Sequence, residues 1–165
     1  MQHGQQFTQA MRDKGFSVSQ PFMECLIRTL SDARFEVERM PATRRPSHPG
    51  VELQGKTDAD ALLNIRIGAG YVSAHGVDDY IPSVTAYAEL LGNNADQQGQ
   101  LYSERYAYGY RSPLSAGIQI DATPGHSYGS FDTLMQSSVQ AGEGLREGAT
   151  LICERLVKDV SGKEQ

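Results

Sequence analysis

Apolar residues recur at helical spacing in two parts of the chain, one near each end. In the first, Phe22, Leu26 and Leu30 lie four residues apart and form one stripe along a helix. Ser19 is expected to act as its N-cap, because a serine oxygen can accept a hydrogen bond from a free backbone N–H. The pattern predicts that this helix ends near Asp32.

A longer apolar stripe predicts a second helix from about Ser130 to Val160. Ser130 is expected to cap it, and Asp132 suits the positive end of the helix dipole. Each glycine inside this helix costs roughly 1 kcal/mol relative to alanine, so we expect the helix to approach the sheet or the first helix closely. The stripe contains Leu134, Ser138, Ala141, Leu145, Ala149, Ile152 and Leu156, and the glycines are Gly142, Gly144 and Gly148.

Between the helices the pattern changes to a period of two, which is typical of strands with one wet face. Turn-forming residues at 92–99 predict a hairpin, and strands joined by short connections are antiparallel neighbours. The chain from about Ala59 to Tyr110 therefore predicts a β-meander, followed by a brief edge strand at 118–120. The predicted strands before that edge strand are 35–40, 61–67, 84–90 and 101–110.

These elements predict one α/β (α+β) domain with the order α-β-β-β-β-α. Its antiparallel sheet of three to four strands is expected to be packed by the two main helices. The domain is expected over 19–160, after a flexible lead-in at 1–18 with one helical turn and before an exposed tail at 161–165. Three prolines and a glycine within 41–50 exclude a central strand, so 41–57 is expected to be a mobile loop.

Composition narrows the function classes. The chain has 165 residues, a length typical of one domain, and 39% of them are hydrophobic. Its net charge of −5 disfavours a nucleic-acid partner, because an acidic surface repels phosphates. Its apolar runs are too short to span a membrane. The opening residues show no secretory signal, which fits a cytoplasmic protein or the mature part of an exported one.

The eight tyrosines all lie between Tyr71 and Tyr128. Five of them fall on the second and third meander strands, where tyrosine pairs well across strands and tolerates a half-wet face. We expect either a stabilising aromatic ladder on an exposed sheet face or a binding face for a partner protein or glycan. These five are Tyr87, Tyr102, Tyr106, Tyr108 and Tyr110.

Candidate chemistry is sparse. His75, Asp78 and Asp79 share one loop, where they fit either a divalent-ion or acid/base site or an ordinary polar loop. No nucleophile elbow, phosphate-binding loop or zinc-ligand spacing is present, so no catalytic, cofactor or metal residue is predicted. Cys25 and Cys153 fit two interpretations: two small core residues, or a disulfide between helices in an oxidising compartment.

One family resemblance follows from the meander. The stretch Asp60 to Ile67, then Gly70-Tyr71, Tyr80 to Val84 and Leu101 to Glu104, resembles a pattern in small bacterial cell-envelope lipoproteins. Their fold is similar to the anticodon-binding-like α/β module of the curli-secretion lipoprotein, the TolB N-terminal domain and the penicillin-binding-protein activator lipoproteins. The resemblance covers about Pro21 to Val160. No lipidated cysteine stands near the N-terminus, so an anchor would belong to a removed segment.

The resemblance implies a non-enzymatic module in the periplasm, tethered to the outer membrane. Such a module would act through contacts with envelope proteins or with a second copy of itself, without a cofactor. Export also favours the disulfide between Cys25 and Cys153. Two alternatives stay open: a hydrolase or metal-dependent enzyme centred on His75, Asp78 and Asp79, and a glycan or peptidoglycan binder that uses the tyrosine-rich sheet face.

Overall fold

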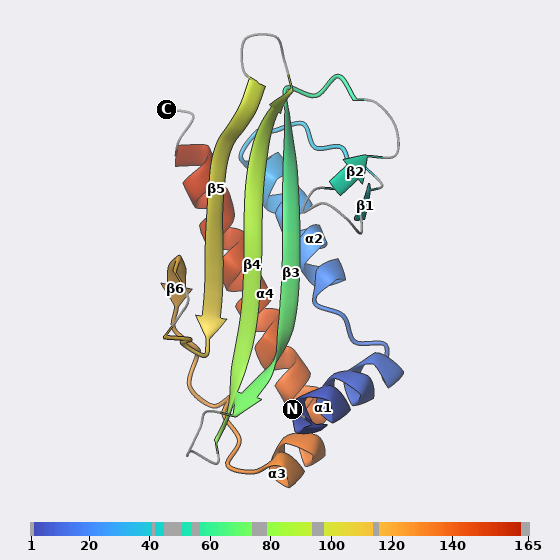
Figure 1. The fold of residues 1–165 in the computed structure, drawn as a ribbon, viewed down its shortest axis with the longest axis vertical. Helices are drawn as coiled ribbons and strands as arrows, with labels where there is room; N and C mark the ends of the chain where they lie inside the picture. The colour runs from blue at the N-terminus through green and yellow to red at the C-terminus, as the bar shows by residue number, and fades with distance from the viewer. Residues whose placement is uncertain are drawn as a thin grey trace.

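The computed structural model describes residues 2–40, 42–44, 51–53, 57–73, 79–93, 98–113 and 116–162, and every structural statement below concerns these ranges. Within them the fold is mixed α/β, with a four-stranded sheet, a separate pair of short strands and four helices (Figure 1). The helices are α1 (Gln2–Asp13), α2 (Ser19–Asp32), α3 (Phe131–Gln136) and α4 (Ser138–Gly162). The strands are β1 (Ala42–Arg44), β2 (Val51–Leu53), β3 (Ala61–Ser73), β4 (Tyr80–Asn93), β5 (Gln98–Gly109) and β6 (Ile118–Ile120).

The main sheet has the order β3-β4-β5-β6. β3, β4 and β5 are antiparallel neighbours, as the meander pattern predicted. β6 pairs with β5 in parallel, with Tyr106 opposite Ile118 and Tyr108 opposite Ile120. The brief edge strand is therefore confirmed. The expectation of a purely antiparallel sheet is wrong. After β5 the chain loops back to a point beside Tyr106, and β6 then runs in the same direction as β5.

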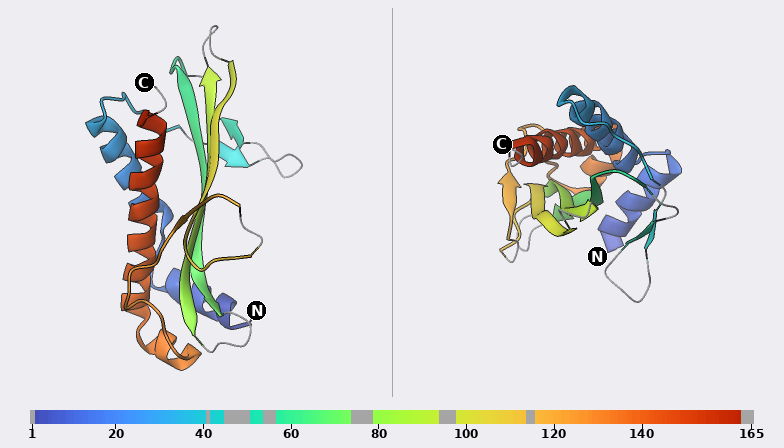
Figure 2. Two further views of the ribbon diagram at one scale, coloured as in Figure 1. Left: turned by 90° about the vertical axis from the view of Figure 1, so that its left-hand side faces the viewer. Right: turned by 90° about the horizontal axis from the view of Figure 1, so that it is seen from above.

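One side of the sheet carries the long helices. α2 and α4 lie together on this side, and no helix among the described residues covers the opposite side (Figure 2). α1 closes the lower end of the same layer, where the Phe7 ring lies 5.2 Å from the ring of Tyr71. Lys14, just after α1, donates a hydrogen bond of 2.5 Å to the hydroxyl of Ser138 at the start of α4. The result is a two-layer domain with one core between helices and sheet.

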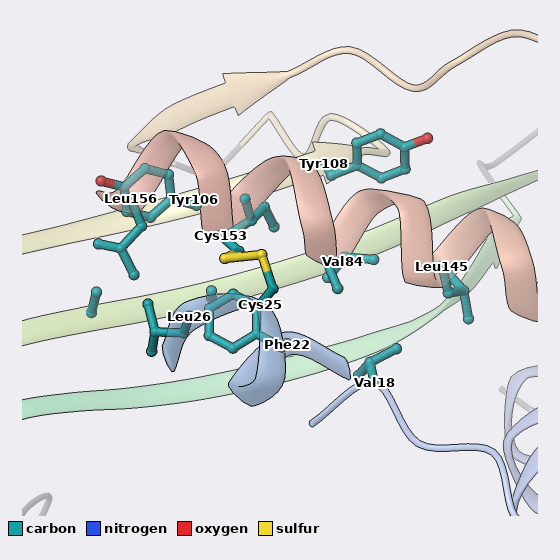
Figure 3. Packing of buried hydrophobic residues seen from close by; sticks show 14 of the residues in the cluster. Val18, Phe22, Cys25, Leu26, Val84, Tyr106, Tyr108, Leu145, Cys153 and Leu156 are labelled. Carbon is teal, nitrogen blue, oxygen red and sulfur yellow. A yellow bond between two sulfur atoms is a disulfide. The ribbon is translucent and has the colours of Figure 1, made fainter. Parts of the chain in front are cut away.

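A disulfide joins the two helices inside this core. Cys25 on α2 is bonded to Cys153 on α4, with their Cα atoms 6.4 Å apart and 128 positions between them in the sequence (Figure 3). Both residues are buried, at 4% and 0% exposure. The hydroxyl of Thr29, one turn along α2, lies within 3.9 Å of both sulfur atoms. Of the two interpretations of these cysteines, the structure shows the bonded one.

Three expectations about the helices and strands are wrong in part. The N-terminal residues form the 12-residue helix α1 in place of a flexible lead-in, because Phe7 and Met11 are buried against the core. Residues 35–40 form no strand; Phe35 instead donates its N–H to the carbonyl of Leu30 and closes α2. The predicted C-terminal helix breaks at Ser137 into α3 and α4, although the apolar stripe continues through the break.

The ends of the helices follow their predicted residues closely. α2 spans Ser19 to Asp32, but Val18 occupies the cap position, and the N–H of Ser19 donates to the hydroxyl of Ser17. Ser130 caps α3 through a bond from the N–H of Thr133. α4 continues to Gly162, so the predicted tail is reduced to 163–165, which lie outside the described residues.

Within the predicted loop at 41–57, β1 and β2 pair with each other in an antiparallel register. They form a two-stranded sheet of their own and do not join the main sheet. Residues 41, 45–50 and 54–56 lie outside the described part of the chain, so the prediction of a mobile loop is tested only where the two strands pair.

Candidate interaction surface

The tyrosines of the meander are divided between the two sides of the sheet. Tyr102, Tyr106 and Tyr108 are 7%, 1% and 0% exposed, because this side of β5 is covered by α4. The expected exposed face built from these three residues is therefore wrong, and with it their use as a glycan-binding surface. The period of two correctly grouped them on one side, but period alone does not say which side the helices cover.

Two of the buried tyrosines belong to a polar network near the C-terminal end of α4. The Tyr106 hydroxyl donates to Asp159 at 2.8 Å and shares a hydrogen bond with the hydroxyl of Tyr102. Arg155 completes the network with an Nε–Oδ1 bond of 3.1 Å to the same carboxylate. Burial raises the pKa of Tyr106 above its ordinary value of 10.0, and the bonds to Tyr102 and Asp159 raise this pKa further. These hydroxyls satisfy one another within the core, so they stabilise the fold and are not presented to a ligand.

The third buried tyrosine lies farther along the helix. The Tyr108 ring lies against Gly148 of α4, and the Tyr108 hydroxyl accepts a hydrogen bond of 3.1 Å from the N–H of Thr123. This glycine contact is the close approach of helix and sheet that the glycine pattern predicted, and Gly144 makes a similar approach to His126.

Tyr87 and Tyr110 differ from the other three. Tyr87 points to the side of the sheet away from α4 and is half-buried. Tyr110 is half-buried just beyond the end of β5, where its N–H donates to the carbonyl of Pro82. Of the five tyrosines predicted as one face, only Tyr87 therefore lies within the strands on the side that the helices leave open.

We call this open side the outer face. Alternation along β3, β4 and β5 places a second set of side chains there, and the strand register aligns them in five rows. The leucine row is Leu62 and Leu91, and the acidic row is Asn64, Glu89 and Ser103. The tyrosine row is Arg66, Tyr87 and Arg105. The glycine rows are Gly68, Thr85 and Ala107, followed by Gly70, Ser83 and Gly109.

Polar contacts organise the centre of the outer face. The Arg105 guanidinium lies 5.9 Å from the centre of the Tyr87 ring, a favourable position for a cation over an aromatic face. The Tyr87 hydroxyl donates to the hydroxyl of Ser103 at 3.4 Å, and Glu89 accepts a bond of 3.1 Å from Gln100. Arg105 is exposed and Tyr87 half-buried, so this surface offers an arginine and a tyrosine, the residue types enriched at binding hot spots.

The predicted chemical loop is described only in part. His75 and Asp78 lie outside the described residues, while Asp79 is exposed next to Gly129. The described residues contain no group of three His, Cys, Asp or Glu side chains that could hold a metal ion.

A pair formed by His126 and Glu147 was not predicted from the sequence. His126 Nε2 lies 2.8 Å from Glu147 Oε2, and the Thr123 hydroxyl donates to the other oxygen of that carboxylate at 2.9 Å. The His126 ring packs over Gly144, where a Cβ would lie within 2.9 Å of it. These hydrogen bonds to Glu147 connect the segment after β6 to α4. Since His126 and Glu147 are 21 positions apart on different elements, no local pattern could have predicted this pair.

Comparisons with known proteins assign no family. No family model matches the chain, and no curated protein matches it. A solved structure from Caulobacter crescentus CB15, described as a "putative lipoprotein", is similar at 14% sequence identity with a TM-score of 0.41. The similarity covers 90% of this chain and 86% of that one. Within the described part of the chain, no helix combines the length and the hydrophobicity needed to cross a membrane.

Proposed function

We propose that this chain is a non-enzymatic module of the bacterial cell envelope, located in the periplasm and tethered to the outer membrane, which works by binding other proteins. The observation that carries this proposal is the buried disulfide between Cys25 and Cys153. Disulfides form and persist in oxidising compartments such as the periplasm and are rare in the cytosol. The bond therefore supports export, which the resemblance to envelope lipoproteins also implies.

The position of the bond supports a structural role for it. It links α2 to α4 across 128 positions, and both sulfurs are buried away from solvent. Redox-active cysteines are typically accessible and lie in electropositive surroundings, whereas these two pack among apolar side chains such as Phe22 and Leu156 (Figure 3). We therefore assign the pair to stability in an extracytoplasmic environment and not to thiol chemistry.

The outer face supports a role in protein binding. It is not covered by a helix, and it combines the leucine row at one end with Arg105 and Tyr87 at its centre. Interfaces between proteins use arginine and tyrosine as anchors for the same physical reasons.

The test of export is the redox state of the protein in its native host. Cells are quenched with acid, free thiols are alkylated, and the mass of the purified chain is measured before and after reduction. We expect both cysteines to resist alkylation until a reductant is added, and the full-length protein to fractionate with the outer membrane. Two freely alkylated cysteines in the native host would contradict export, and recovery from the cytosolic fraction would do the same.

The test of protein binding uses the outer face. In vivo crosslinking of the full-length protein is compared between the wild type, Tyr87→Ser and a control, Gln140→Ser, on the exposed surface of α4. We expect Tyr87→Ser alone to remove the crosslinked species. Equal crosslinking in all three proteins would exclude the outer face as the contact surface.

A further inference from the structure

The outer face contains glycines that the isolated chain does not need. Gly68 and Gly70 lie in the middle of β3 without the positive φ that requires glycine. A Cβ at Gly70 would meet nothing within 4 Å, and one at Gly68 would meet only the Thr85 hydroxyl at 3.9 Å. Glycine weakens a strand, so β-branched residues would stabilise the monomer here. Glycine inside a strand often marks a place that another molecule approaches closely.

The rows of the outer face complement one another in both shape and charge. Large apolar side chains form the leucine row, and small ones form the first glycine row. Between them lie the acidic row, with Glu89, and the tyrosine row, with Arg105. Along the strands, the order is therefore large, negative, positive and small. When a second copy presents these rows in the reverse order, its small row faces the large row of the first copy, and its positive row faces the negative row.

From this order we infer that the outer face binds a second copy of this chain through a two-fold axis. The axis lies between the two faces, perpendicular to the strands, and passes between the acidic and tyrosine rows. It places Glu89 of each copy opposite the tyrosine row of the other, within reach of Arg105. It also places each leucine row on the glycine row Gly68, Thr85 and Ala107 of the other copy. Sheets packed face to face interdigitate large and small side chains in this way.

The two-fold pairing rests on the proposed role of the outer face in protein binding, and it names a second copy of this chain as the partner. An acidic or basic partner protein would complement only one of the two charged rows, whereas a second copy complements both. The same face on both subunits is what a two-fold interface requires.

The experiment is sedimentation velocity of the oxidised full-length chain from low micromolar to near-millimolar concentration. We expect a reversible dimer that weakens with added salt, because exposed charge pairs are screened. Gly68→Val should abolish the dimer and leave the fold intact, since the new side chain fills the site of the partner's leucines. Gln140→Val on α4 is the matched control and should dimerise normally. Circular dichroism and thermal melting of each variant verify folding.

Charge reversal distinguishes this interface from any other. Glu89→Arg and Arg105→Glu should each raise the dimer dissociation constant by about tenfold or more. Each substitution creates a pair of like charges across the interface, and the two-fold symmetry repeats this pair. The double variant should regain dimerisation. A chain that stays monomeric at the highest concentration overturns the inference. So does a dimer that tolerates Gly68→Val, or a double variant that is no better than the single ones. If the dimer tolerates Gly68→Val, or if the double variant does not regain dimerisation, the outer face binds a partner other than a second copy.

Discussion

The ring of Tyr108 on β5 lies directly against Gly148 on α4, with no side chain between strand and helix. An added Cβ at Gly148 would overlap the Cδ1, Cε1 and Cγ atoms of that ring. Both residues are fully or almost fully buried, so the ring has no room to move aside. This contact sets how closely the longest helix can pack on the sheet.

Gly148→Ala is therefore expected to destabilise the protein. Alanine favours a helix by roughly 1 kcal/mol over glycine, but overpacking a rigid core costs more. We expect a net loss of about 1–3 kcal/mol in the free energy of unfolding, measured by urea denaturation. Gly162→Ala, where a Cβ meets nothing within 4 Å, is the control and should be neutral or stabilising. Equal effects at both positions would contradict the role of the Tyr108 contact.

Removal of the disulfide is expected to be the largest single change. A bond that closes a loop of this length restricts the unfolded chain strongly, and its loss should lower the free energy of unfolding by about 4 kcal/mol. The measurement compares thermal unfolding of the wild type with Cys25→Ala/Cys153→Ala. A reductant should lower the midpoint of the wild type and leave the double variant unchanged. A wild type insensitive to a reductant under unfolding conditions would show that the bond is absent in solution.

Arg34→Gly is expected to stabilise the protein. Arg34 has a φ of +69°, and its N–H and that of Phe35 donate to Ser31 and Leu30 in the pattern that ends many helices with glycine. A side chain at positive φ costs about 1–2 kcal/mol, part of which glycine loses again to backbone entropy. We expect a net gain of roughly 0.5–1 kcal/mol by urea denaturation. Arg28→Gly, inside the same helix, should instead lose about 1 kcal/mol.

High pH is expected to unfold the protein through its buried tyrosines. Burial raises the pKa of Tyr71, Tyr102, Tyr106 and Tyr128 above the ordinary value of 10.0. The folded state therefore holds these protons more tightly than the unfolded state. Their contribution is fully present below about pH 10 and is lost as the pH rises above it.

Urea titrations at increasing pH, with tyrosinate absorbance recorded in parallel, measure this effect. Tyr106→Phe should reduce the alkaline loss of stability, whereas Tyr87→Phe on the outer face should leave it nearly unchanged. Tyrosines that all ionise near pH 10 without unfolding would contradict the burial of these hydroxyls.

The strands of the main sheet and the two main helices were predictable because their patterns are local. Phe22, Leu26 and Leu30 place α2 on the core without reference to any other element. α1 was not predictable in the same way, because Phe7 and Met11 are two apolar residues in a polar stretch, and they are buried through distant contacts such as those with Tyr71 and Gly142. The segment 35–40 shows the opposite case. Its alternation is that of a strand, but a strand also needs a neighbour, and none pairs with it in the described ranges.

The candidate surface was only half predictable. The period of two along 101–110 groups Tyr102, Tyr106 and Tyr108 on one side of the strand and Arg105 on the other, since alternation decides which residues share a side. It could not say which side the helices cover, because that depends on how α4 returns to the sheet.

The sequence by itself determined where the strands of the main sheet and the two main helices form, which residues share a side of a strand, and that the long helix must approach something closely at its glycines. Only the tertiary structure decided that Tyr108 is what Gly148 meets, that Cys25 and Cys153 are within bonding range, and that the row of Tyr87 is the open one. These outcomes depend on contacts between residues far apart in the chain. Backbone periodicity, which extends over a few residues, carries no information about them.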